Sequence, residues 1–427
     1  MPDTNRLDAA AHVLLLLARL LLEAGADSEH VRRRVEALAE RQDFAAELFL
    51  GSERLLLMLG NDQVYRTRIG HALGVMGIDA GRLVALEEVA TAIEAGTLEL
   101  EAAAARLSVI AKARPAYPGW LTILAVAGTA AALARLFSAT LPVVGAAFLA
   151  GAVSTVLRRV LPRLRVGPAA AAGITATISG MTAVLASRPS GADPTLALVA
   201  AGMILVPGVP LINGVRDLMQ GHAAIGLARI ANGAITVIAI AAGLAATSLA
   251  VGVHLPVTLN TPNLGLAWDL LFSSIAAFGF AILFGAPRGA VPTIMLTGAL
   301  AHGLRTALMM LGSDIAIATL AGATLAGVLA RLVGRRLGTP SSALAFPSVV
   351  AMVPGSYAFR GLIGALDIML AGPAAPAALL AASAAALISA LVLTVSIGIG
   401  LLLSSALNPA IFGLGKQAAK VRMSPPR

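Results

Sequence analysis

The chain has 427 residues, of which 58% are hydrophobic and 12% are charged, and its formal net charge is +9. Soluble globular proteins carry about 25% charged residues, so this chain lacks the polar surface that a cytosolic enzyme needs. The absence of cysteine excludes disulfides, thiolate metal sites and cysteine catalysis.

The distribution of the basic residues indicates a membrane protein. Lys and Arg lie mostly between apolar blocks, as on the inner face of a membrane protein, and we expect no nucleic-acid partner. The six His residues are scattered and form no HExxH pattern, so no metal site and no cofactor are expected.

Residues 1–118 carry most of the acidic groups and predict a small soluble α+β domain. The apolar run Val13–Leu22 is interrupted by Arg19 and is far shorter than the ~20 residues that span a bilayer. Its flanks argue against a cleaved signal peptide. We therefore expect a buried helix over Asp8–Glu23, and then a second helix that Ser28 caps and that runs through Arg41.

The rest of this domain is predicted to hold strands and then helices. The stretches Glu47–Leu59 and Gln63–Ile69 are strand-like, with a turn signal at Gly60-Asn61-Asp62 between them. Helices are expected at about Leu83–Glu94 and Leu98–Ala113, with Thr97 capping the second. Carboxylates at helical spacing beside Arg favour solvated helix faces over a catalytic site.

Residues 119–427 contain about ten apolar blocks, each near the ~17–25 residues that a spanning helix requires. The blocks cover residues 119–137, 141–157, 167–187, 194–214, 224–251, 264–285, 289–310, 315–334, 343–366 and 377–403. Helices are expected because backbone polar groups in lipid must be satisfied within the segment. The predicted fold is an all-α polytopic membrane protein of about ten transmembrane helices, preceded by the small α+β domain.

The loops between blocks predict the orientation. Most Lys and Arg of these loops lie on the same side of the membrane as residue 118 and the basic tail 404–427. Because Lys and Arg are enriched in cytoplasmic loops, we expect both termini in the cytoplasm and the protein in the cell inner membrane.

An internal repeat divides the membrane region. Leu205-Val206-Pro207-Gly208 recurs as Met352-Val353-Pro354-Gly355, an offset of 147 residues (354 − 207), and this offset also registers the first five blocks on the last five. The same offset aligns Leu157-Arg158 with Leu304-Arg305, although two-residue matches often arise by chance in a chain rich in Ala, Gly and Leu. Because five is odd, consecutive repeats over 119–251 and 264–403 have opposite orientations, as two inverted five-helix repeats.

The repeated motif predicts two broken helices. Proline removes helical hydrogen bonds, and both breaks fall near the middle of a ~30 Å hydrocarbon core. The half-helices that follow, Leu211–Leu218 and Ser356–Leu366, would direct amide groups at a cavity that accepts a carboxylate. A kink used only for packing is the alternative. The predicted contacts from the breaks are Pro207, Gly208, Val209, Pro210, Pro354, Gly355 and Ser356.

A few other polar residues lie at membrane depth. Arg216, Asp217 and Arg360 follow the breaks and are candidates for substrate binding. The alternatives are pairing of Arg216-Asp217 with a group in the partner repeat, and snorkelling of the two arginines to the headgroups. Asn213 either contacts substrate or bonds between helices. Asp269 and His302 are candidates for carrying a proton, although Asp269 also fits an interfacial carboxylate and His302 an interhelical donor.

Three stretches make the chain resemble the threonine/serine exporter family. They are Ala18–Ala26 with Val35-Glu36, the approach through Leu107–Ile110 to Ala116–Trp120, and Leu205–Leu218 with Gly221, Gly226 and Arg229. The resemblance implies a cytosolic domain fused to ten spans and proton-driven export of small hydroxylated amino acids. Some relatives split the two parts into separate proteins and are associated with succinate export.

By match to the family motif, the shared core would be Pro207, Gly208, Pro210, Asn213, Arg216 and Asp217. Residues 137–142 lack the Gly-rich turn that the family pattern has after its first span.

The sequence therefore predicts a secondary exporter that binds a small molecule, an amino acid or a dicarboxylate, inside the bilayer. A homo-oligomer is left open. An integral-membrane enzyme would need clustered polar residues at one face or a GxSxG or Walker motif, and neither is seen. A channel would need a filter motif or a ring of like charges, and the predicted outer loops carry too little charge to suggest one.

Overall fold

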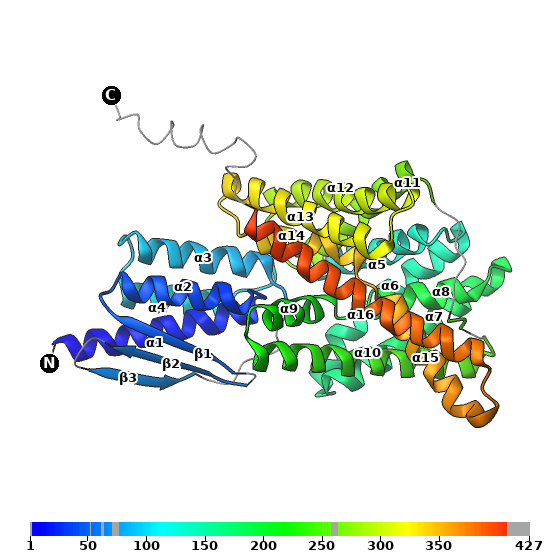
Figure 1. Cartoon of the computed structure of the whole chain (residues 1–427), viewed down its shortest axis with the longest axis horizontal. Coiled ribbons are helices and arrows are strands. Elements are labelled where there is room, and N and C mark those ends of the chain that lie inside the picture. The colour runs from blue at the N-terminus through cyan, green and yellow to red at the C-terminus, as the bar shows by residue number, and fades with distance from the viewer. Residues whose placement is uncertain are drawn as a thin grey trace.

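The computed structural model describes residues 2–51, 53–60, 64–70, 77–253, 255–257 and 264–407. The predicted basic tail beyond residue 407 and Asn61-Asp62 of the predicted turn lie outside the described residues. In Figure 1 the helices and strands of the region predicted to be soluble, which we call the soluble domain, lie at one end of a bundle of long helices.

The soluble domain packs four helices with a small antiparallel sheet. Its elements are α1 (Pro2–Glu23), α2 (Ser28–Glu40), β1 (Ala45–Leu50), β2 (Leu55–Gly60), β3 (Tyr65–Ile69), α3 (Ala80–Glu94) and α4 (Leu100–Ala111). The strands pair in the order β1-β2-β3, with Ala45 opposite Gly60 and Leu56 opposite Ile69. Helix α1 packs against β2 and β3, and its leucines fill the core, which agrees with the buried helix expected there.

Three local predictions in this domain were wrong. The stretch Glu47–Leu59 forms two strands, because the chain turns back where the Gly51 amide bonds the Arg54 carbonyl at 3.1 Å. Asp27 caps α2 in place of Ser28, since its carboxylate accepts from the His30 amide at 2.9 Å. Glu99 precedes α4, and the Thr97 hydroxyl bonds the Ala92 carbonyl at 3.0 Å instead of capping.

Each of the ten apolar blocks coincides with one helix or with one bent pair. The helices are α5 (Gly119–Leu136), α6 (Leu141–Val160), α7 (Pro168–Ser187), α8 (Pro194–Met203), α9 (Gly208–Met219), α10 (Ala223–Val251), α11 (Leu266–Leu283), α12 (Val291–Met310), α13 (Ile315–Leu337), α14 (Ser341–Val349), α15 (Gly355–Ala371) and α16 (Ala377–Ala406).

Among the described residues, seven helices are long and apolar enough to cross a membrane, or nine spans if each bent pair counts as one. Helix α12 is not among them, since His302 and Arg305 reduce its hydropathy. The structure thus supports a multi-pass membrane protein with seven to nine candidate spans, where the sequence predicts ten.

Both predicted breaks are present. Helices α8 and α9 meet at 52°, and α14 and α15 meet at 46°. Each break is a tight turn on the proline: the Gly208 amide donates to Val206 at 2.9 Å, and the Gly355 amide donates to Val353 at 2.8 Å. Pro207 has φ −79° and ψ 67°, the geometry of an inverse γ-turn.

The two breaks touch each other reciprocally. A β-carbon placed on Gly208 would lie 2.8 Å from a Val353 methyl, and one on Gly355 would lie 2.6 Å from a Val206 methyl. Glycine is therefore required at both points for the backbones to approach.

The helix packing of the first five blocks recurs in the last five. The pairs α5–α6 and α7–α10 have counterparts in α11–α12 and α13–α16. Across the two sets, α9 packs on α16 and α10 packs on α15. The paired breaks therefore lie where the two sets of helices contact each other.

Candidate functional site

A cavity of about 200 Å³ lies beside the paired breaks; we call it the distal cavity. One water molecule occupies ~30 Å³ in the liquid, so the cavity suits a small solute and not a lipid or a peptide. The lining residues that are polar or belong to the two breaks are Val206, Asp269, His302, Arg305, Thr306, Val353, Pro354, Ser356 and Tyr357.

The distal cavity lies away from the soluble domain. It is lined by Leu136 at the end of α5, by Asp269 at the start of α11 and by Met310 at the end of α12. The soluble domain contacts the opposite end of α11, where the Ala80 amide donates to the Phe284 carbonyl at 2.7 Å. The cavity and the soluble domain are therefore at opposite ends of these helices.

A chain of polar contacts crosses one wall of the distal cavity. His302 Nδ1 lies 2.8 Å from Asp269 Oδ1, and the Thr306 hydroxyl donates to Asp269 Oδ2 at 2.8 Å. Arg305 continues this series of contacts. Its Nη1 lies 3.4 Å from His302 Nε2, and its Nε donates to the Thr319 hydroxyl at 3.0 Å. Asp269 and His302 are both buried.

Helix geometry explains how these groups meet. His302 and Arg305 are three residues apart on α12 and share one face. Small residues let α11 approach that face: a β-carbon on Gly298 would lie 2.6 Å from the Ala277 methyl, and one on Gly303 would overlap Leu270. The carboxylate of α11 can therefore reach the imidazole of α12.

The lining of the distal cavity is dipolar. Among the described lining residues, Asp269 supplies one carboxylate and Arg305 one guanidinium, with His302 between them. Ser356 and Tyr357 add hydroxyl groups at the first turn of α15, whose free amide groups favour an anion. The cavity can thus receive a negative and a positive group at once.

The predicted break residues are only partly at this cavity. Pro354 and Ser356 line it, whereas Pro207, Gly208, Val209, Pro210 and Gly355 are not among its lining residues. Arg360 points elsewhere: Nη1 donates to the Val257 carbonyl at 2.8 Å and Nε to the Ser356 carbonyl at 3.0 Å.

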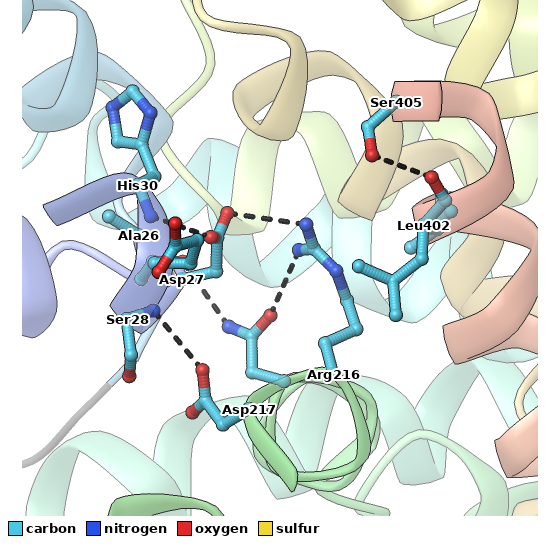
Figure 2. Close-up of polar contacts among 12 residues, drawn as sticks. Ala26, Asp27, Ser28, His30, Arg216, Asp217, Leu402 and Ser405 are labelled. Carbon is cyan, nitrogen blue, oxygen red and sulfur yellow. Dashed lines mark hydrogen bonds and ion pairs between the residues drawn. The ribbon is translucent and has the colours of Figure 1, made fainter. Parts of the chain in front are cut away.

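Asn213, Arg216 and Asp217 lie outside the distal cavity and bind the soluble domain. Figure 2 shows the loop between α1 and α2 seated on α9, with the Ser28 amide donating to Asp217 Oδ1 at 3.1 Å. Asn213 Nδ2 donates to the Gly25 carbonyl at 3.2 Å, and Arg216 Nη2 lies 3.2 Å from Asp27 Oδ2.

A second buried ion pair completes this contact. Arg229 Nη1 lies 2.6 Å from Asp217 Oδ2, and both side chains are almost inaccessible to solvent. Burial opposes the charged form of Asp27, but the positive charges around it, that of Arg216 the largest, and the hydrogen bond from the His30 amide together outweigh burial and hold the pKa of that carboxyl below its usual range. We call Asp27, Asn213, Arg216, Asp217 and Arg229 the docking cluster. It fixes the second half of a broken helix to the soluble domain.

Three polar residues of the distal cavity were not predicted as site residues from the sequence, namely Arg305, Thr306 and Tyr357. One signal for Arg305 was present, because the repeat offset places Arg158 on Arg305. A two-residue match in an Ala-, Gly- and Leu-rich chain is too common to single out one arginine.

Two family models match the chain. The model described as "Putative threonine/serine exporter" covers residues 12–251, and the model described as "Threonine/Serine exporter, ThrE" covers residues 269–407. The two matches meet near the boundary between the two sets of helices.

The curated relatives are named either as a threonine/serine exporter or as a subunit of a succinate transporter. The chain is 29% identical over 297 residues to a "Probable threonine/serine exporter" of Mycobacterium tuberculosis, a match that covers 66% of this chain and 56% of that protein. It is 29% identical to a "Probable succinate transporter subunit YjjP" of Klebsiella aerogenes, over 53% of this chain and 88% of the relative. The protein of the same name from Escherichia coli is 27% identical, over 56% and 94%.

The chain therefore spans little more than half the length of the Mycobacterium relative. No solved structure matches it. Since the first family model alone covers more than half of the sequence, the chain belongs to the threonine/serine exporter family.

Proposed function

We propose that the protein is a secondary active exporter of small amino acids such as threonine and serine, located in the cell inner membrane with both termini in the cytoplasm. The observation that carries the proposal is the dipolar lining of the distal cavity, where one carboxylate and one guanidinium face the same small space. A free amino acid is a zwitterion with this charge pattern.

Each part of the substrate has a counterpart in the cavity. The substrate carboxylate binds Arg305 and the first-turn amides of α15, as charge-assisted hydrogen bonds. The ammonium group binds Asp269, and a side-chain hydroxyl bonds Ser356 or Tyr357. Apolar residues of both breaks, Val206 among them, form the rest of the wall.

Asp269 also supplies a basis for proton coupling. A proton and the substrate ammonium group compete for the same carboxylate, so protonation from one side favours release of the substrate there. His302 holds Asp269 through Nδ1 and faces Arg305 through Nε2, so protonation of the pair also changes the environment of the carboxylate-binding arginine. Competition of this kind gives exchange of proton for substrate.

The arrangement of the helices supports alternating access. The recurring packing and the reciprocal contact of the breaks favour two inverted five-helix repeats around one central site. With the soluble domain in the cytoplasm, the distal cavity faces outward. The docking cluster then holds α9 at the cytoplasmic side.

A second substrate class is a dicarboxylate, favoured by the names of the two YjjP relatives. The described lining of the distal cavity holds one arginine, so a second carboxylate would need His302 in its protonated form. Protonation would then strengthen binding, and the coupling would have the opposite sign. An enzyme is disfavoured, because the family is named for transport.

The proposal is tested by counterflow in proteoliposomes. Labelled serine, threonine and succinate are supplied outside vesicles that hold each compound unlabelled. The proposal requires counterflow of serine or threonine and loss of counterflow in Arg305→Ala. Counterflow of succinate alone supports the dicarboxylate alternative, flux independent of trans substrate indicates a channel, and absence of flux contradicts transport.

A further inference from the structure

A second cavity, of about 320 Å³, lies at the junction of the soluble domain and the membrane helices; we call it the proximal cavity. Ile78 and Asp79 approach it from the soluble domain. Its polar lining on the helices consists of Tyr117, Thr122, Thr155, Arg158 and Arg159.

The proximal and distal cavities are built from equivalent positions of the repeat. Arg158 corresponds to Arg305 (305 − 158 = 147), and each of the following pairs has the same offset. These pairs of lining residues are Thr122 and Asp269, Thr155 and His302, Arg159 and Thr306, Leu283 and Leu136, and Phe284 and Phe137. In the last two pairs, the residue of the later repeat lines the proximal cavity and its mate lines the distal one.

Both cavities thus place an arginine of the same repeat position beside an equivalent pair of helices. Arg305 is on α12, which packs on α11, and Arg158 is on α6, which packs on α5. Among the described residues Arg158 has no hydrogen bond or ion pair, whereas Arg159 Nη1 donates to the Gly119 carbonyl at 2.8 Å. The guanidinium of Arg158 is therefore available to an anion in the cavity.

We propose that the proximal cavity is a second substrate site, which binds the carboxylate of the amino acid through Arg158 on the cytoplasmic side. This inference rests on the proposed transport function and adds a loading site to it. A pair of inverted repeats produces equivalent cavities that open to opposite sides of the membrane, and the two cavities match this expectation.

The two sites differ in the groups that carry protons. In the proximal cavity, Thr122 and Thr155 occupy the repeat positions that Asp269 and His302 occupy in the distal cavity. The carboxylate that lines the proximal cavity is Asp79 of the soluble domain, whose Oδ1 accepts from the Arg82 amide at 2.9 Å. The loading site is completed by the soluble domain, and the carboxylate–imidazole pair belongs to the distal site alone.

The absence of cysteine in the native chain makes the test direct. Thr155→Cys is labelled with a membrane-impermeant thiol reagent in inverted membrane vesicles, with and without threonine, serine or succinate. Ser356→Cys, labelled from the opposite side, is the matched control for the distal site. Counterflow by each cysteine variant verifies that it is folded.

We expect the substrate to slow labelling of Thr155→Cys several-fold. Arg158→Ala in the same chain abolishes this protection, and Arg158→Lys retains part of it because the charge is kept. Protection of Ser356→Cys persists in both backgrounds.

Three results overturn the inference. Thr155→Cys is not labelled from the cytoplasmic side, or it is labelled at a rate that no substrate changes, or phosphatidylglycerol in the vesicles protects it while the substrates do not. The last result identifies a lipid phosphate as the ligand. If Ser356→Cys is also unprotected by every substrate, the proposed function fails as well.

Discussion

Val206 packs directly against Gly355, in the space that a β-carbon at that position would fill. The reciprocal contact joins Val353 to Gly208, so the two broken helices meet at the point where each changes direction. The distal cavity lies beside this contact, since Val206 and Val353 both line it.

Gly355→Ala tests this contact. The added methyl group would lie 2.6 Å from Val206, and an overpacked core costs about 1–3 kcal/mol when its neighbours must shift. We expect a lower unfolding temperature in detergent and a slower exchange rate. Gly128→Ala in α5 is the control, since nothing lies within 4 Å of a β-carbon there. Equal exchange rates in the two variants would show that the contact has no role in transport.

Arg305→Ala tests the anion-binding end of the distal cavity. A hydrogen bond to a charged group is worth about 1.5–3 kcal/mol, so we expect threonine to bind roughly 10- to 100-fold more weakly. Isothermal titration calorimetry on purified protein measures the change. Arg188→Ala is the matched control, because Arg188 is exposed and donates to the Val251 carbonyl at 3.3 Å. Unchanged affinity in Arg305→Ala would place the carboxylate elsewhere.

The positions of the helices and of both breaks were predictable, because apolar length and proline are local signals. The pairing of Asp269 with His302 was not, although both residues were singled out, since it depends on how closely Gly298 and Gly303 let two helices approach.

The contacts of Arg216 and Asp217 also could not be predicted from the sequence. Both follow a break in a membrane helix and were candidates for substrate binding, with snorkelling or pairing across the repeats as alternatives. Their partners in the soluble domain lie about 190 residues earlier, in the loop around Asp27 and Ser28. No local pattern indicates that this loop reaches α9.

Asp217→Asn tests the docking cluster. The substitution leaves the Arg229 guanidinium buried without its carboxylate, and breaking a buried pair in this way costs about 3–5 kcal/mol. We expect the soluble domain to be cleaved from the membrane region much faster by limited proteolysis. The control is Asp193→Asn, because Asp193 caps α8 through an exposed hydrogen bond that asparagine can also make. An unchanged cleavage rate would show that the domain docks by other contacts.

The soluble domain contains a pH-sensitive contact between α2 and α3. Burial disfavours the imidazolium of His30, but the 2.6 Å hydrogen bond to Glu87, the charge of that carboxylate and the charge of Asp27 together outweigh burial and raise the pKa of His30. Because the folded-state pKa is raised, this stabilisation is complete below the ordinary pKa of histidine and is lost as pH rises through the raised value.

We therefore expect the protein to lose stability as pH increases across this range, as measured by thermal unfolding. Glu87→Gln removes most of this dependence, whereas Glu88→Gln, at the exposed neighbouring position, leaves it intact. A pH dependence that survives in Glu87→Gln would assign it to other groups.

The pH dependence of threonine binding tests the central claim most directly, namely that substrate and proton share Asp269. Affinity is measured by calorimetry on the wild-type protein, on Asp269→Asn, and on Asp314→Asn, which keeps its capping bond to the Ala316 amide and serves as control. We predict that threonine binds more weakly as pH falls in the wild-type protein and in the control, and weakly at every pH in Asp269→Asn. Binding that tightens on acidification, or an unchanged pH dependence in Asp269→Asn, would contradict the account.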